Sequence, residues 1–173
     1  MNSREKILSK LFEDPQKKYY LRELARELKL NPSRVSKLLL ELEKEKLINR
    51  IVKKHILEIS TNFENKEFIE EKRVFNLQVF YHSKILDFLI REYNPKSISI
   101  YGSFSQGRDL RNSDIDIAIF SNVDRDNEII LESFEKKLKR KIHLLVIEKN
   151  KMTDEIYTNI INGIVVYGYL DKK

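Results

Sequence analysis

Two short groups of residues in YGSFSQGRDLRNSDIDIAIF, residues 101–120, carry side chains suited to phosphate and metal chemistry. The first is Gly102-Ser103 and the second is the pair Asp114 and Asp116, with ten residues between Ser103 and Asp114. Glycine at a turn lets backbone N–H groups approach an anion closely, and a serine hydroxyl adds a donor. Paired carboxylates repel each other unless a cation lies between them. Together the two groups predict a site for triphosphate and divalent cations, as nucleotidyl transfer requires.

The elements that position these residues follow from the alternation of apolar and polar side chains. SISIY, residues 97–101, and DIDIAIF, residues 114–120, predict strands, and the segment after Gly102 has room for one or two helical turns at most. Alternate side chains of a strand point to the same face. The isoleucines of the second strand therefore face a core, whereas Asp114, Asp116 and Ala118 face the other side.

GSFSQG and SDIDIAI resemble the minimal branch of the polymerase beta-type nucleotidyltransferase superfamily, in which Gly-Ser precedes Asp-x-Asp by about ten residues. INGIVVYG, near the end of the chain, is similar to the final strand of such domains. The resemblance implies an α/β domain with a mixed sheet that takes an NTP as substrate or ligand. It also implies that Gly102 and Ser103 bind the nucleotide, and that Asp114 and Asp116 are catalytic residues and ligands of one or two Mg²⁺ ions.

Two other positions in this part leave their roles open. Arg108, in the loop between the two groups, either assists phosphate binding or is a solvated cation. Family members that catalyse carry a third carboxylate on a neighbouring strand, and His143 of KIHLLVIE, residues 141–148, occupies that place here. Glu148 points to the opposite face and is a poor substitute. Because Mg²⁺ prefers oxygen ligands, the candidate roles of His143 are to bind substrate, to act as a base or to fill space.

The charged residues are distributed unevenly along the chain. Residues 1–60 carry 15 Lys/Arg and 9 Asp/Glu, whereas residues 61–173 carry 18 of each, so the net charge of +6 (6 plus 0) arises in the first 60 residues. A basic segment joined to a balanced one predicts a nucleic-acid-binding module. The alternative is a solvated basic face.

The basic segment has the pattern of three short helices and a hairpin. Apolar residues recur at helical spacing in three stretches: Ile7, Leu8, Leu11 and Phe12; Leu21, Leu24, Ala25 and Leu28; and Val35, Leu38, Leu39 and Leu42. Asn31 is placed to cap the third helix and Pro32 to occupy its first position. LINRIVKKHILEIS then has two β-prone runs around Lys53 and Lys54. This order predicts a winged helix-turn-helix.

In such a domain the third helix enters the major groove of double-stranded DNA. The outward-facing residues at its N-terminal end, which would reach bases and phosphates, are Ser33, Arg34, Ser36 and Lys37. Lys53 and Lys54 would contact the DNA backbone. LRELARELKLNPSRVSKLLLELEKEKLI resembles the helix-turn-helix of MarR-like and archaeal transcription regulators, and the alternative is a helical subdomain that binds protein. A homodimer is expected on DNA, because a single module buries too little surface for strong specificity.

The expected fold class is α+β, with three parts. Residues 1–62 form the winged helix-turn-helix domain and residues 95–173 form the minimal nucleotidyltransferase domain. Between them, residues 63–94 are expected to form one long connecting helix or two, because apolar residues recur there at helical spacing without a Gly/Ser/Pro linker. This helical segment is also the expected dimer contact.

The composition excludes several other classes of protein. There is no cysteine, which rules out disulfides and thiolate metal sites. No apolar run approaches the roughly 20 residues of a membrane span. The first residues lack the apolar stretch of a signal peptide, so a cytoplasmic location is expected.

Three functions remain open from the sequence. The protein is a Mg²⁺-dependent enzyme that moves NMP from an NTP to a hydroxyl of a protein, a nucleic acid or a small molecule, with the winged helix recruiting it to DNA. Alternatively, it is a DNA-binding regulator that senses the nucleotide without turning it over. The third hypothesis is the antitoxin of a toxin–antitoxin pair, a role that minimal nucleotidyltransferases often have.

Overall fold

A computed structural model describes residues 1–53, 56–122, 128–147 and 153–170. The chain divides into two compact units, residues 1–72 and 73–173. The boundary between the units falls inside helix α4, Lys66–Ser83. Within the described ranges, no helix has the length and apolar character needed to cross a bilayer.

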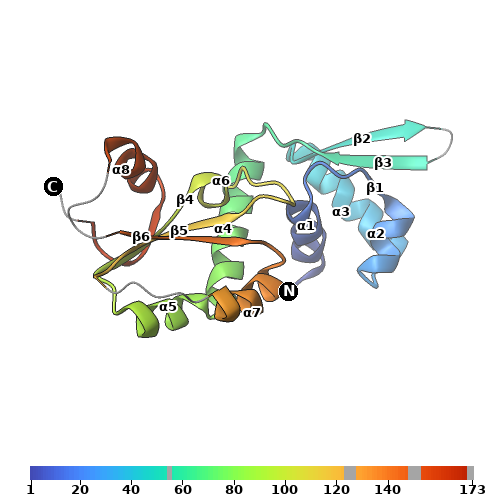
Figure 1. Cartoon of the computed structure of the whole chain (residues 1–173). Helices are drawn as coiled ribbons and strands as arrows, with labels where there is room; N and C mark the ends of the chain where they lie inside the picture. The colour runs from blue at the N-terminus through green and yellow to red at the C-terminus, as the bar shows by residue number, and fades with distance from the viewer. Residues whose placement is uncertain (54–55, 123–127, 148–152, 171–173) are drawn as a thin grey trace. The chain divides into compact units, whose positions relative to one another are not determined.

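The first unit contains the three helices and the hairpin expected from the sequence, with one additional short strand (Figure 1). The bounds are α1 Ser3–Glu13, β1 Tyr19–Tyr20, α2 Leu21–Glu27, α3 Pro32–Lys44, β2 Ile48–Lys53 and β3 Ile56–Thr61. The strands form an antiparallel sheet in the order β1-β3-β2. The second helix therefore begins directly after a strand that pairs with the hairpin.

Side-chain caps determine where two of these helices begin. The Asn2 carboxamide oxygen accepts the Glu5 N–H at 2.9 Å, and the Glu5 carboxylate accepts the Asn2 N–H at 2.9 Å, which is a capping box. At α3, the Asn31 side chain accepts the Ser33 N–H at 2.8 Å and Pro32 occupies the first helical position. The start predicted for the third helix is confirmed.

The core of the first unit is formed by the apolar stripes of the helices and by the inner face of the sheet. Its buried members include Ile7, Leu8, Leu11, Phe12, Tyr19, Leu24, Ala25, Val35, Leu39, Leu42, Ile48 and Ile59. Leu21, Leu28 and Leu38, which were expected in the same stripes, are only half-buried. Leu28 is the C-cap of α2, and Leu38 flanks the stripe of α3 instead of lying at its centre.

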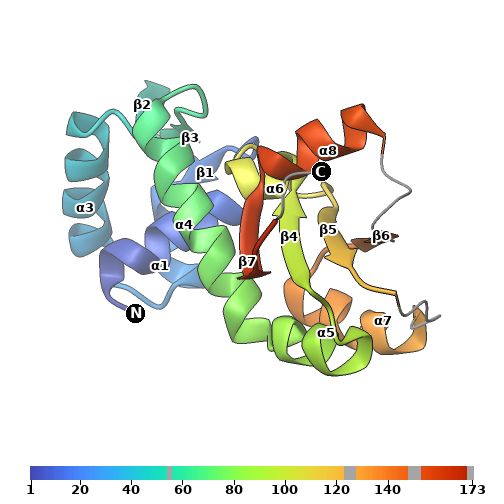
Figure 2. The ribbon, with the colours of Figure 1, turned by 90° about the vertical axis from the view of Figure 1, so that its left-hand side faces the viewer.

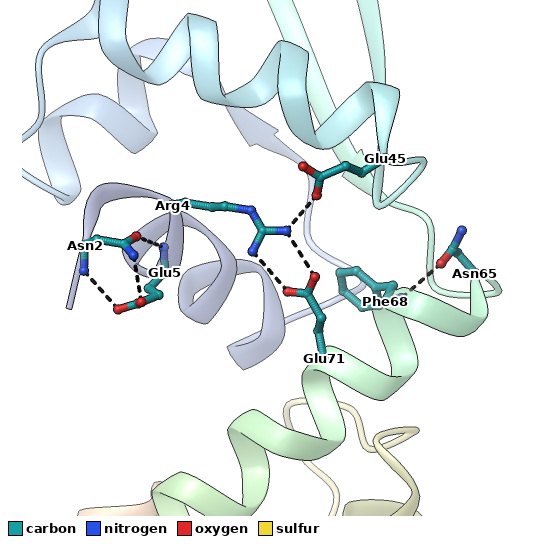
Figure 3. A network of polar contacts seen from close by, with 7 residues as sticks. All are labelled: Asn2, Arg4, Glu5, Glu45, Asn65, Phe68 and Glu71. Atoms are coloured by element: carbon teal, nitrogen blue, oxygen red, sulfur yellow. Dashed lines mark hydrogen bonds and ion pairs between the residues drawn. The ribbon is translucent and has the colours of Figure 1, made fainter.

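Arg4 connects α1 to two other helical segments of the first unit (Figure 3). Its Nη2 lies 2.6 Å from Glu45 Oε2, at the end of α3, and 3.0 Å from Glu71 Oε1 of α4. The hydrogen bond to Glu71 is the main reason that the pKa of Arg4 is raised. All three side chains remain partly solvated, so each pair is expected to contribute less than about 1 kcal/mol to the free energy of unfolding.

The second unit contains a mixed sheet, as expected, and this sheet has four strands. The remaining elements are α5 Ile85–Tyr93, β4 Ser97–Tyr101, α6 Gly102–Gln106, β5 Ile115–Phe120, α7 Glu128–Leu138, β6 Ile142–Ile147, α8 Asp154–Ile161 and β7 Ile164–Gly168. The strand order is β6-β5-β4-β7, with β5 and β6 parallel and the other neighbours antiparallel. The second predicted strand starts at Ile115 instead of at Asp114.

The two faces of this sheet have different cover. One face carries the buried isoleucines of β4 and β5 and packs against α5, α7 and the second half of α4. The opposite face carries Ala118 and Ile147, which pack against Ile160 of α8. Figure 2 shows α8 on the opposite side of the sheet from α5 and α7. The alternation of apolar residues along β5 therefore identified its core face correctly.

The helical segment after residue 65 is two helices. Lys84 adopts a left-handed φ of 67° between α4 and α5. Ser83 stabilises the break, because its hydroxyl donates to the Phe80 carbonyl at 2.6 Å and accepts the Ile85 N–H at 3.2 Å. These side-chain bonds replace helical ones, so the chain changes direction without leaving the Ile85 amide unpaired.

Candidate functional site

The Gly102 turn and Asp116 are in contact at the end of the central strands. Tyr101, the last residue of β4, pairs with Asp116 in β5, and Gly102 begins α6 with a φ of +69°. A Cβ on Gly102 would lie 2.5 Å from Asp116 Oδ2. Glycine is therefore needed here twice, for the backbone conformation and for the space that the carboxylate occupies.

Local hydrogen bonds hold this turn in place. The Ser105 hydroxyl donates to the Gly102 carbonyl at 2.8 Å, and the Ser103 carbonyl accepts the Arg108 N–H at 2.9 Å. Ser103 is half-buried as the second residue of α6, whereas Arg108 is exposed in the following loop. Ser103 therefore follows Gly102 in a fixed turn, and the backbone of Arg108 is hydrogen-bonded to that turn.

Asp114, Asp116 and His143 occupy the starts of two neighbouring parallel strands. Asp114 is exposed directly before β5, and Asp116 pairs in register with His143 of β6. The His143 Nδ1 lies 3.4 Å from Asp116 Oδ1, and the His143 side chain is 67% exposed. The imidazole therefore stands next to the aspartate pair, where the resemblance implied a third carboxylate. Glu148 lies outside the described residues.

The chemistry of these side chains fits Mg²⁺ only when other ligands join them. Among the residues that the structure describes, no three His, Cys, Asp or Glu side chains are grouped to hold a metal ion. Asp114 and Asp116 supply oxygen ligands, and Mg²⁺ in phosphate-transfer sites is commonly held by one or two carboxylates plus phosphates and water. The site therefore suits a cation that arrives with a triphosphate, in preference to a cage made by the protein alone.

A cavity of about 650 Å³ opens beside these residues. It is lined by Asp114, Leu131, Glu132, Glu135, Lys141, Ile142 and His143. Glu135 is fixed in its wall, because its carboxylate accepts from Lys141 Nζ at 2.8 Å and from the Ile142 N–H at 2.9 Å. Both bonds lower the pKa of Glu135, and the bond from Lys141 has the larger effect. Asp114 and His143 are therefore accessible to a small molecule that enters this cavity.

Tyr101 borders the site on the side opposite to His143. It is paired with Asp116 across β4 and β5 and packs against the apolar cluster under α8. Burial, and secondarily the charge of Asp116, raise the pKa of the Tyr101 phenol. The phenol therefore stays protonated and able to donate a hydrogen bond beside the carboxylate.

A buried polar network lies behind the site and was not anticipated from the sequence. Asp109 is fully buried in the loop before Asp114, and its Oδ2 lies 2.6 Å from Arg140 Nη2. Its Oδ1 accepts a hydrogen bond from Asn76 Nδ2 at 2.6 Å. Arg140 belongs to the run KLKRK, and Asp109 to a loop rich in polar residues, so both patterns are typical of solvated surface. No local signal distinguishes these two residues from their exposed neighbours.

The residues predicted to contact DNA lie at the start of α3 and on the β2–β3 hairpin. Of the four helical positions, Ser36 is half-buried and the exposed ones are Ser33, Arg34 and Lys37. The Arg34 Nε donates to the Ser3 hydroxyl at 2.9 Å. Lys53 is exposed as the last residue of β2, and Lys54 lies outside the described residues.

Comparison with protein families supports the assignment of the second unit. Residues 82–167, just under half of the chain, match the family model described as Nucleotidyltransferase domain. The matched range extends from the end of α4 to β7 and contains the Gly102 turn, both aspartates and His143. Such domains generally use an NTP and Mg²⁺. A search among curated proteins gives no significant match. The chain therefore carries a nucleotidyltransferase domain, which supports a nucleotidyltransferase-like function.

Proposed function

We propose that this protein is a DNA-binding regulator whose nucleotidyltransferase domain binds an NTP with Mg²⁺ and transfers the nucleotide slowly or not at all. The observation that carries the proposal is the pairing of His143 with Asp116 in adjacent parallel strands. It puts an imidazole where the resemblance implies the third carboxylate of a catalyst. Nucleotide binding requires the Gly102 turn and the aspartate pair, whereas efficient transfer requires more.

The proposed nucleotide binding depends on the close approach of the Gly102 turn to the carboxylates. Gly102 leaves room for Asp116, and the backbone amides at the start of α6, with the Ser103 hydroxyl, supply donors for phosphate oxygens. A bound Mg²⁺ would be held by Asp114 and Asp116 and would neutralise charge on the phosphates. Exposed Arg108, whose backbone is tied to Ser103, adds a cation near the phosphates.

Any transfer would follow the in-line course of nucleotidyl chemistry. The oxygen of an acceptor hydroxyl forms a bond to the α-phosphorus, and the bond from that phosphorus to the oxygen bridging to the β-phosphate breaks. Pyrophosphate leaves with the electron pair, and the hydroxyl proton passes to a base. The cavity beside Asp114 and His143 offers space for the acceptor. His143 lines this cavity, and its imidazole is a candidate for the base that takes the proton.

The proposal is tested by incubating the protein with each radiolabelled NTP and Mg²⁺. Filter retention measures binding, and labelled protein, nucleic acid or small molecule measures transfer. Retention of at least one NTP with little or no labelled product is expected. Efficient labelling of an acceptor would instead support the enzyme hypothesis, and no retention of any NTP would contradict nucleotide binding.

Gly102→Ala is expected to abolish NTP binding at moderate cost to folding. The added methyl group would meet Asp116 Oδ2 at 2.5 Å, and its residue would have to keep a φ of +69°. We expect a loss of about 1 kcal/mol in the free energy of unfolding from the strained backbone. Urea unfolding and filter retention measure the two effects. Gly107→Ala changes another positive-φ glycine, at the end of α6, and controls for backbone strain. NTP binding by Gly102→Ala at the wild-type level would contradict the role of Gly102.

The DNA-binding half of the proposal depends on the first unit. Its order of elements is helix, strand, helix, helix and hairpin, and the whole positive charge excess of the chain lies in residues 1–60. The exposed residues at the N-terminal end of α3 include Arg34 and Lys37. These features support a winged helix-turn-helix with α3 in the major groove. A homodimer on DNA is part of the same proposal.

Replacing Arg34 and Lys37 by Ala is expected to weaken binding to double-stranded DNA by about tenfold or more. Each cation lost removes one phosphate contact, so the dependence of affinity on salt becomes shallower as well. Mobility-shift titration at several salt concentrations measures both. Lys66→Ala removes an exposed cation from α4 and is the control. Unchanged DNA binding in the double variant would exclude α3 as the contacting element.

A further inference from the structure

We propose that Arg140 is a positioning residue for the nucleotide site, although it belongs to none of the predicted site groups. It clamps the loop that joins the Gly102 turn to the aspartate pair. This inference rests on the proposed NTP binding and identifies what keeps the two halves of that site at a fixed separation. It concerns only residues of the second unit.

The guanidinium of Arg140 is in contact with nearly the whole loop. Nη1 donates to the carbonyls of Leu110, Ser113 at 3.1 Å and Arg111 at 3.3 Å. Nη2 lies 2.6 Å from Asp109 Oδ2, and only 9% of the Arg140 side chain is exposed. Four polar groups of this loop, the carboxylate of Asp109 and the carbonyls of residues 110, 111 and 113, thus converge on one planar group. An ammonium group cannot reproduce this, because its three donors originate from a single point.

The other end of the clamp reaches α6. Asn76 Nδ2 donates both to Asp109 Oδ1 at 2.6 Å and to the Phe104 carbonyl at 2.9 Å. The Arg140 guanidinium also lies over the Phe104 ring, 5.9 Å from its centroid. Phe104 follows Ser103 directly in α6. Through Asn76, Asp109 and Arg140, the helix that carries the phosphate-binding turn is therefore bonded to the loop that ends at the first aspartate.

The loop also has bonds that need this clamp to keep their geometry. The Leu110 N–H donates to the Ser113 hydroxyl at 2.9 Å, and the Ser113 N–H donates to the Leu110 carbonyl at 3.1 Å. The Ile115 N–H donates to the Lys141 carbonyl at 2.9 Å, which fixes the start of β5 next to Arg140. Because the Leu110 carbonyl accepts from both Arg140 and the Ser113 N–H, loss of the guanidinium frees the carbonyls of this loop to turn. The position of Asp114, directly before β5, then becomes variable.

Binding of a triphosphate with its cation depends on the distance between its donors and its carboxylates. Displacement of a site group by about 1 Å can reduce function by about 10²-fold. The Arg140 side chain is 9% exposed and the Asp109 side chain is fully buried. An ion pair held this tightly is rigid enough to set the distance between the phosphate donors and the carboxylates. Neither residue needs to touch the nucleotide. This explains why a buried ion pair is placed beneath a loop that is otherwise polar.

Arg140→Lys is the variant that tests the inference, because it keeps the charge opposite Asp109 and the aliphatic stem but loses the planar fork. Ile85→Val, in α5, is the matched control: it removes one buried methyl group at a typical cost of about 1 kcal/mol and makes no bond to the loop. Urea unfolding gives the global stability of both variants. Hydrogen exchange of amides 108–115, compared with amides of β4, gives local opening, and calorimetry with Mg²⁺ and the NTP retained by the wild type gives affinity.

In Arg140→Lys we expect loop exchange to accelerate and NTP affinity to fall, each by about tenfold or more, while β4 exchange follows global stability. In Ile85→Val, loop exchange should follow global stability alone and NTP affinity should stay at the wild-type value. If loop exchange and NTP affinity change no more in Arg140→Lys than in Ile85→Val once global stability is taken into account, Arg140 has only a structural role and the inference is wrong. If the wild type binds no NTP, the proposed function fails, and the exchange comparison still decides whether Arg140 clamps the loop. If Arg140→Lys does not fold, guanidinium NMR signals of wild-type Arg140 decide: slow rotation and slow exchange are expected, and rapid averaging would contradict the clamp.

Discussion

Asp116→Asn should abolish the Mg²⁺-dependent part of the thermal stabilisation that an NTP gives to this protein. A ligand that binds only the folded state at 100 times its Kd adds about 2.7 kcal/mol to the free energy of unfolding. The magnesium-dependent share of this gain requires the anionic oxygens of Asp116, one of which occupies the space left by Gly102. The amide of asparagine has a similar shape but supplies no negative charge, so the cation would lose one of its two proposed carboxylate ligands.

The fold should survive this substitution. Asp116 is a half-buried strand residue near Asp114, and removing one of two neighbouring carboxylates relieves repulsion in the absence of a cation. Thermal melts are compared for wild type and variant with NTP alone, with Mg²⁺ alone and with both. Asp87→Asn, which neutralises an exposed aspartate of α5, is the control and should keep the full shift. A magnesium-dependent shift of equal size in Asp116→Asn and in the wild type would mean that this carboxylate is not a ligand.

The parts of the site that the sequence predicted are those encoded by short-range periodicity. Alternation along residues 114–120 placed the isoleucines in the core and Asp116 on the opposite face, and the structure agrees. Periodicity could locate Asp116 because a strand has only two faces, so each side chain has one alternative. The place of His143 came from the resemblance, which implied a third carboxylate there, and the strand register pairs His143 with Asp116.

The buried clamp could not be predicted in this way, because its members are far apart in the chain. Asn76 and Asp109 are separated by 33 residues, and Arg140 meets the carbonyl of Leu110 across 30. Asp109 and Arg140 both have polar neighbours in the sequence. Whether such a side chain is buried depends on which distant segments pack around it. The short strand β1 was missed for a related reason: two residues carry too little pattern to be separated from the following helix. Contacts that depend on topology leave no local signal.

The helix break at Lys84 lies between these two cases. Apolar spacing from residue 65 to 93 is helical throughout, and it predicted either one helix or two. The difference is made by Ser83, whose hydroxyl competes with the helical bonds at Phe80 and Ile85. A serine inside a helical pattern is compatible with both outcomes, because its side chain can point to solvent or bond to the backbone. Only the local geometry distinguishes them.

His143→Asp is expected to increase nucleotide transfer by tenfold or more, which corresponds to a barrier lower by about 1.4 kcal/mol. The substitution would place a carboxylate in register with Asp116, where the His143 Nδ1 now lies 3.4 Å from the Asp116 Oδ1. An added anionic oxygen at this point suits Mg²⁺ and favours deprotonation of an acceptor hydroxyl in the adjoining cavity. Binding of the NTP should change less than its turnover, because Asp114, Asp116 and the phosphate-binding turn remain.

The same substitution should destabilise the protein slightly when no cation is present, since it adds a third negative charge beside Asp114 and Asp116. Stability without Mg²⁺ therefore has to be measured together with transfer of radiolabelled NMP. His82→Asp makes the same chemical change at an exposed position of α4 and should leave transfer at the wild-type rate. If the wild type already labels an acceptor efficiently and His143→Asp slows the reaction, then the imidazole takes part in the chemistry. The protein would in that case be an enzyme that uses histidine in place of the third carboxylate, and the interpretation as a nucleotide-binding regulator would be wrong.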